Sequence, residues 1–160
     1  MMPLPKNLRA LALVAMAVAL VATAAHAEIE VYTTSLSGAN EVPTNGSTAD
    51  GTASLMVDTV TLEATYALQF SNLSAAQTGA HFHNAPAGAN GPVVFGLPVG
   101  SPIGGTWSML QSDYDLLVAG SIYINVHSLE FPGGEIRGQM VFENVGTEST
   151  TLGAVKSLFR

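Results

Sequence analysis

Apolar and polar residues alternate with a period of two along much of the chain, most clearly over Leu62–Phe70. An extended strand would gather the leucine, alanine, tyrosine and phenylalanine side chains of this run on one face, whereas a helix would scatter them. Shorter runs of the same kind lie between turns that contain glycine or proline. They predict six further strands: Glu30–Leu36, Thr52–Val57, Gly79–His83, Val93–Leu97, Ser121–His127 and Glu135–Phe142.

About seven to eight short strands separated by such turns are typical of two antiparallel sheets packed face to face. We therefore expect an all-β protein with an antiparallel β-sandwich fold. One helical turn is predicted near Ser112–Val118, with Ser112 or Asp113 capping its start and Gly120 ending it.

The first 27 residues follow a different pattern. The stretch Leu8–Ala25 is predominantly apolar; it has Lys6 and Arg9 at its start and ends at an Ala25-His26-Ala27 sequence. This pattern predicts a secretory signal peptide over residues 1–27, cleaved after Ala27. The alternatives are cleavage after Ala25, which would leave His26 as a copper-chelating N-terminus, and a retained membrane anchor.

Cleavage would leave one domain over residues 28–143 and a C-terminal tail or last short element over residues 144–160. We expect this product in an extracytoplasmic compartment, either periplasmic or secreted. Two of the five basic residues and none of the twelve acidic ones lie in the signal segment, so the mature net charge is −9. That charge disfavours nucleic acid and anionic membranes as partners. The absence of cysteine excludes disulfides, thiolate catalysis and lipoprotein attachment.

The candidate chemistry lies on one face of three predicted strands. His81 and His83 are separated by one residue, so a strand points both to the same side. In the strand that ends at His127, the isoleucine and valine side chains alternate with polar ones and are expected to face the core. Across three neighbouring strands, the shared polar face would carry His81, His83, Tyr123, Asn125, His127, Glu135, Arg137 and Gln139. On the last of these strands, Ile136, Met140 and Phe142 would face the other way.

A His-x-His pair on a strand, together with a distant histidine, is a common way to build a copper or zinc site. The alternative is a hydrogen-bonded network in which the histidines order the loops with Tyr123, Asn125 and Glu135. A Glu135–Arg137 pair could likewise be structural or could bind an anion. The glycine-rich turns Ala87–Pro92 and Phe131–Gly134 are expected beside the histidine face.

Three ordered motifs resemble the CHRD domain of the animal protein chordin and of many bacterial exported proteins. They are LSGANEVP (36–43), AHFHNAPAGANGPVVF (80–95) and GSIYINVHSLEFPGGEIRGQM (120–140). The resemblance covers about residues 29–143. It implies a secreted immunoglobulin-like, Greek-key β-sandwich, and it implies no defined biochemical activity.

A weaker likeness concerns copper/zinc superoxide dismutase. It implies that His81, His83 and His127 are copper ligands and that Arg137 guides an anion to the metal. Val93 stands where that family has its metal-bridging histidine, and residues for a zinc subsite and its disulfide are missing. At most, a copper-only site with three histidines is implied.

Two functions are therefore expected. The first is a non-catalytic module that binds an extracellular protein or glycan through its loops, because no nucleophile motif such as G-x-S-x-G is present. The alternative is a mononuclear copper protein, or less favourably a zinc protein, that uses the three histidines and has superoxide-dismutase-like chemistry if it is an enzyme. An acidic surface disfavours fast turnover of an anion, so metal storage or delivery is the preferred form of this alternative.

Overall fold

The computed structural model describes residues 28–143. The predicted signal segment and the predicted C-terminal tail lie outside the described residues. Within residues 28–143 the chain forms nine strands, one α-helix and a short 3-10 helix. They are β1 (Ile29–Ser37), η1 (Gly38–Asn40), β2 (Asp50–Asp58), β3 (Glu63–Ser71), β4 (Gln77–Asn84), β5 (Val93–Leu97), β6 (Ile103–Ser108), α2 (Gln111–Val118), β7 (Ile122–Ser128), β8 (Ile136–Gln139) and β9 (Val141–Glu143).

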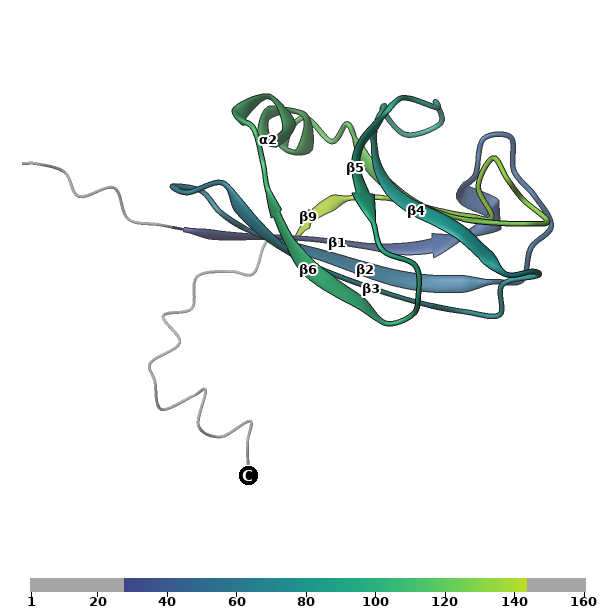
Figure 1. The fold of residues 1–160 in the computed structure, drawn as a ribbon. Helices are drawn as coiled ribbons and strands as arrows, with labels where there is room; N and C mark the ends of the chain where they lie inside the picture. Colours follow the sequence, from purple (N-terminus) through teal and green to yellow (C-terminus); the bar gives the residue numbers. More distant parts are fainter. Residues whose placement is uncertain (1–27, 144–160) are drawn as a thin grey trace, which may run out of the picture.

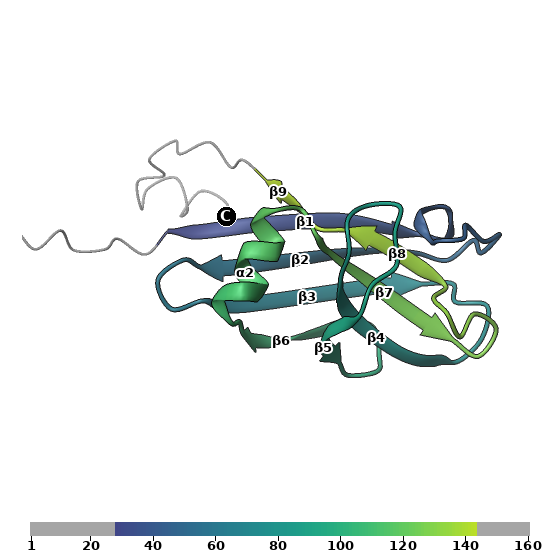
Figure 2. The ribbon, with the colours of Figure 1, turned by 90° about the horizontal axis from the view of Figure 1, so that it is seen from above.

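The strands pair antiparallel in the order β5-β4-β7-β8-β1-β2-β3-β6, and β9 pairs with β1. This sheet folds over itself into two layers: β1, β2, β3 and β6 form one, and β4, β5, β7 and β8 cross above it (Figures 1 and 2). The layers are joined where Ser37 of β1 pairs with Arg137 of β8. At the other end, Phe95 of β5 stacks on Trp107 of β6 with ring centroids 4.9 Å apart. The predicted all-β antiparallel architecture is confirmed, in a nearly closed, barrel-like form.

The core lies between the two layers and follows the period-two pattern. On β3, Ala64, Tyr66 and Leu68 are buried, while the intervening side chains are exposed. Above them, Phe82 of β4 stacks on Trp107 with ring centroids 5.4 Å apart. The histidine-bearing strand is therefore anchored through the face opposite its histidines.

Strand β6 was not among the predicted strands. Its sequence, IGGTWS, contains two adjacent glycines, which weaken any alternation signal. The structure shows why a side chain is missing at Gly105: a Cβ there would lie 2.5 Å from the Tyr66 hydroxyl oxygen. The close approach of Tyr66 therefore requires glycine at this position.

The prediction of one strand over Glu135–Phe142 was wrong in its second half. The last hydrogen bond to β7 is made by the Met140 amide, which donates to the Ile122 carbonyl. Beyond Met140, β9 pairs with β1 alone. Phe142 is consequently 51% exposed instead of facing the core. Its ring contacts the edge of Tyr32, with centroids 5.4 Å apart.

The predicted helical turn is confirmed as α2, which lies over one end of the lower layer (Figure 2). The predicted cap was wrong, because Leu110 is the N-cap and Asp113 instead accepts a hydrogen bond from the Leu110 amide at 3.3 Å. Gly120, with φ +69°, follows the helix as predicted. No helix in the part of the chain that the structure describes is long and apolar enough to cross a membrane.

Candidate metal centre

Strands β4 and β7 are neighbours and bring the three histidines together. In their antiparallel register His81 lies opposite Asn125, His83 opposite Tyr123, and His127 opposite Gly79. Directly opposed residues share a face of the sheet, so all of these side chains project from the outer side. The histidine side chains of β4 and β7 therefore lie on one face of the sheet, as the alternation along these strands predicts.

The three imidazole rings form a compact cluster. Their centroids are 5.0 Å apart for His81 and His127, 5.6 Å for His81 and His83, and 6.2 Å for His83 and His127. One ligand nitrogen from each ring lies within 4.8 Å of the others. His83 is buried, and the other two rings are partly exposed.

Two backbone carbonyls fix the orientation of two of these rings. The Nδ1 atom of His83 lies 2.9 Å from the Gly91 carbonyl oxygen, and Nδ1 of His127 lies 3.0 Å from the Pro132 carbonyl oxygen. A carbonyl only accepts, so each Nδ1 carries the proton and each Nε2 keeps a free lone pair. Both glycine-rich turns thus lie beside the histidine face, as predicted.

In each of the three rings, one nitrogen has no hydrogen-bond partner. Nδ1 of His81, Nε2 of His83 and Nε2 of His127 are all buried and unpaired. A buried polar atom without a partner costs about 1–3 kcal/mol, so three in one place need a physical reason. A bound cation that accepts all three lone pairs would explain why these nitrogens have no hydrogen-bond partners.

The protonation states of His81 and His127 suit metal binding. Burial lowers the pKa of His81, and the neighbouring His127 and His83 lower it further. Burial also lowers the pKa of His127, against the opposing effect of the hydrogen bond to Pro132. Both rings are therefore held in the neutral form that binds metal ions at neutral pH.

Gly91 is the point where the β4–β5 loop meets the cluster. Its carbonyl accepts from His83, and its amide donates to the Tyr123 hydroxyl at 3.2 Å. A Cβ at this position would collide with the Asn84 carbonyl and lie 3.0 Å from the Ala85 Cβ.

The G91A variant is therefore expected to shift the loop and lose the hydrogen bond that orients His83. Such supporting bonds typically contribute 10–100-fold to metal affinity, and we expect a loss in that range. Titration of Zn²⁺ followed by calorimetry measures it. The G46A variant, whose new methyl group has open space, is the control; equal affinities for the two variants would contradict the expectation.

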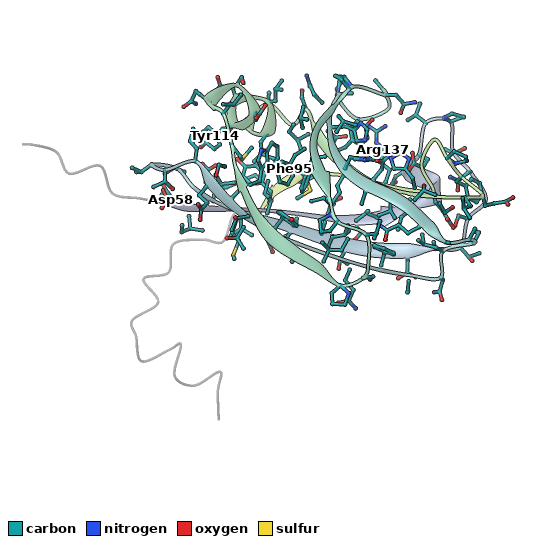
Figure 3. The ribbon with its side chains drawn as sticks, in the orientation of Figure 1. Asp58, Phe95, Tyr114 and Arg137 are labelled. Atoms are coloured by element: carbon teal, nitrogen blue, oxygen red, sulfur yellow. The ribbon has the colours of Figure 1, made fainter. Side chains whose placement is uncertain are left out.

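Tyr123 and Arg137 form a column of stacked groups behind His83. The rings of His83 and Tyr123 are nearly parallel, 9° apart, with centroids separated by 4.8 Å. The Arg137 guanidinium carbon lies 3.4 Å from the Tyr123 ring centroid. Because β7 lies between β4 and β8, Tyr123 separates Arg137 from His83. The Arg137 side chain, which is labelled in Figure 3, therefore supports Tyr123.

Asn125 and Glu135, which were both expected on the histidine face, lie in different surroundings. Asn125 is buried on the histidine face, opposite both His81 and Arg137. Glu135 instead points into a pocket of serines, where its Oε1 accepts from the Ser47 hydroxyl at 2.7 Å and the Ser74 amide at 2.7 Å.

The predicted pairing of Glu135 with Arg137 is consequently wrong. Burial alone would raise the pKa of Glu135, but hydrogen bonds from Ser128, Ser74 and Ser47 hold it below its ordinary value. Serine donors thus replace the guanidinium as the groups that stabilise this carboxylate.

The carboxyl group that interacts with Arg137 comes from Glu41, which the sequence analysis did not select. Glu41 follows η1 and is only 5% exposed. Burial raises its pKa to about 7, although the nearby Arg137 cation lowers it. The available signal was the position of Glu41 within the LSGANEVP motif, which carried no assigned role.

This carboxyl makes stability depend on pH. The folded protein binds the Glu41 proton more tightly than the unfolded chain does. The stabilisation that comes from this proton is therefore complete below about pH 4.5 and is lost as pH rises through about 7. The loss amounts to about 3 kcal/mol at most.

The E41Q variant should lack this dependence and exceed the wild type in stability at pH 8. Urea unfolding of both proteins at pH 5 and pH 8 measures the difference, and the histidines cancel in the comparison. Parallel pH profiles for the two proteins would contradict the assignment.

A family model for the CHRD domain matches residues 32–140 of the chain. This range contains β4, β7 and β8, and with them the whole cluster. No curated protein and no solved structure matches the chain. None of these comparisons supports the likeness to copper/zinc superoxide dismutase.

Proposed function

This chain belongs to the CHRD domain family, and on that premise we propose that it is an exported, non-catalytic module that holds one metal ion on His81, His83 and His127. The family membership supplies the β-rich scaffold. The metal function rests on the histidine cluster of this chain.

The observation that carries the proposal is the set of three buried nitrogens without hydrogen-bond partners. A purely structural network would pair these atoms with neighbouring side chains. Instead, the two hydrogen bonds made by the rings of His83 and His127 go to backbone carbonyls on the far side of each ring. Those bonds leave Nε2 of both rings free, which favours metal binding over the network.

Three imidazole ligands suit copper and zinc, and a site of nitrogen ligands binds copper more tightly than zinc. Nitrogens bound at about 2.0 Å to one tetrahedral ion lie about 3.3 Å apart. From separations of up to 4.8 Å, the rings would have to move together by roughly 1.5 Å. The His81 ring is partly exposed and makes neither of the carbonyl bonds that orient His83 and His127, so its rotation would supply most of that movement.

Holding or delivering the ion fits this site better than turnover of an anion. Arg137 is buried behind Tyr123, so it offers no positive charge beside the cluster. The net charge of −9 expected after cleavage would also slow the approach of an anion. We infer an extracytoplasmic location from the signal-peptide pattern, and the loops remain available to an extracellular protein or glycan partner.

Metal content is the decisive measurement. Protein purified from the exported fraction without chelators, and then titrated with Cu²⁺ or Zn²⁺, is expected to bind close to one ion per chain. The H81A/H127A variant should lose this ion, with affinity reduced by more than about 100-fold. Elemental mass spectrometry and isothermal calorimetry give the two values.

The T78A variant is the matched control. It removes an exposed side chain from the same strand and leaves the histidine face unchanged. Equal metal content in the T78A and H81A/H127A variants would refute the site. A wild-type protein that binds no ion in the titration would refute the function.

A further inference from the structure

A cavity lined by both polar and apolar residues lies on the other side of the Tyr123–Arg137 column. Its volume is about 630 Å³, which is in the range of small-molecule sites. It is formed by the segment that follows β1, the β4–β5 loop and β8. Its lining residues are Thr34, Ala39, Asn40, Glu41, Val42, Pro43, Thr44, Ala87, Gly88, Arg137 and Gln139.

Arg137 gives this cavity a buried cation. The side chain is only 2% exposed, and its guanidinium donates to the Asn90 side-chain oxygen at 3.0 Å and to the Pro86 carbonyl at 3.5 Å. Neither of these partners is a carboxylate. A buried charge is costly unless an opposite charge and hydrogen bonds compensate for it, and two neutral acceptors compensate only in part.

Glu41 is the second ionisable group in the lining, and its burial favours the neutral acid. A neutral carboxyl leaves the Arg137 charge unbalanced and itself carries a proton to donate. Val42, Pro43 and the methyl groups of Ala39 and Ala87 add apolar surface to the same cavity.

We propose that this cavity binds a small organic carboxylate, whose anionic group pairs with Arg137 while its apolar part contacts Val42 and Pro43. The guanidinium fork matches a carboxylate in shape and charge. This site is additional to the metal centre and does not depend on it, because Tyr123 lies between Arg137 and His83.

Glu41 makes the binding depend on pH. As a neutral acid it donates a hydrogen bond to the bound carboxylate, and as an anion it repels it. The charged groups around it are Arg137 on β8 and Glu130, which lines an adjoining cavity together with Glu41. Ionisation of Glu41 adds a negative charge beside the ligand as pH rises, so affinity is expected to be higher at pH 6 than at pH 8.

Calorimetric titration of the metal-free protein with sodium butyrate at pH 6 tests the proposal, and butyramide serves as the uncharged probe of the same shape. We expect butyrate to bind at least 10-fold more tightly than butyramide. The R137K variant keeps the charge but loses the fork, and it should weaken butyrate binding by about 10-fold or more.

The A87W variant provides an independent test, because it fills the cavity from an exposed position and leaves Arg137 in place. It should abolish butyrate binding, whereas A76W, which enlarges an exposed alanine in the β3–β4 loop, should leave binding unchanged. Equal binding of butyrate and butyramide, or undiminished butyrate binding by A87W, would overturn the proposal.

Discussion

The G134A variant is expected to unfold about 3 kcal/mol more easily than the wild type, because it combines steric overlap with backbone strain. Gly134 is buried and has φ +134°, a conformation that residues with a Cβ rarely adopt. A Cβ there would lie 2.5 Å from Glu41 Oε1 and 2.8 Å from Asn125 Nδ2. Neither group can move freely, since both are buried. Urea unfolding monitored by the fluorescence of Trp107 measures the change.

The neighbouring G133A variant is the control for this prediction. Gly133 has open space around its missing side chain and lies in the same turn. Its substitution should change the free energy of unfolding by less than about 0.5 kcal/mol. Similar losses in both variants would show that the turn as a whole, and not the contact with Glu41 and Asn125, limits stability.

Saturation of the metal-free protein with Zn²⁺ is expected to raise the free energy of unfolding by about 4 kcal/mol when free metal exceeds Kd by about 1,000-fold. The ion would bind the folded protein through three nitrogens that the fold holds together, and the unfolded chain offers no such cluster. In a domain of this size, that gain corresponds to an increase in melting temperature of more than 10 °C. Thermal unfolding with and without Zn²⁺ measures it.

In the H81A/H127A variant the same addition of Zn²⁺ should leave the melting temperature unchanged. The variant itself should fold, because these side chains lie on the outer face and the core contacts of Phe82 are on the other side of the strand. An equal shift in both proteins would assign the stabilisation to sites outside the cluster.

Hydrogen bonds join the three sequence motifs to one another. Asn90 donates to the Val42 carbonyl at 2.6 Å and accepts from Arg137, so it links one loop to both neighbouring motifs. Asn45, just beyond the first motif, donates to the carbonyls of Gly134 and Glu135. Through Gly91, the same assembly holds His83, so the loops and the metal centre form one structural unit.

Much of the site could be predicted because it depends on local geometry. Strand pleating alone placed His81 and His83 on one side and Phe82 on the other. The alternation around Asn125 placed His127 on the outer face of its strand. The errors arose where the chain leaves regular structure, as at Met140, where a change of strand partner exposes Phe142, and at Glu135, whose carboxylate turns toward loop serines.

The sequence by itself determined that the described chain is β-rich, where most strands run, and which side chains share a face, because alternation is a property of neighbouring residues. Only the tertiary structure decided that β4 lies beside β7, that Glu41 is the carboxyl group near Arg137, and which imidazole nitrogens lack partners. These features depend on contacts between residues far apart in the chain. Their pairing is selected by packing of the whole sheet, and no local pattern encodes it.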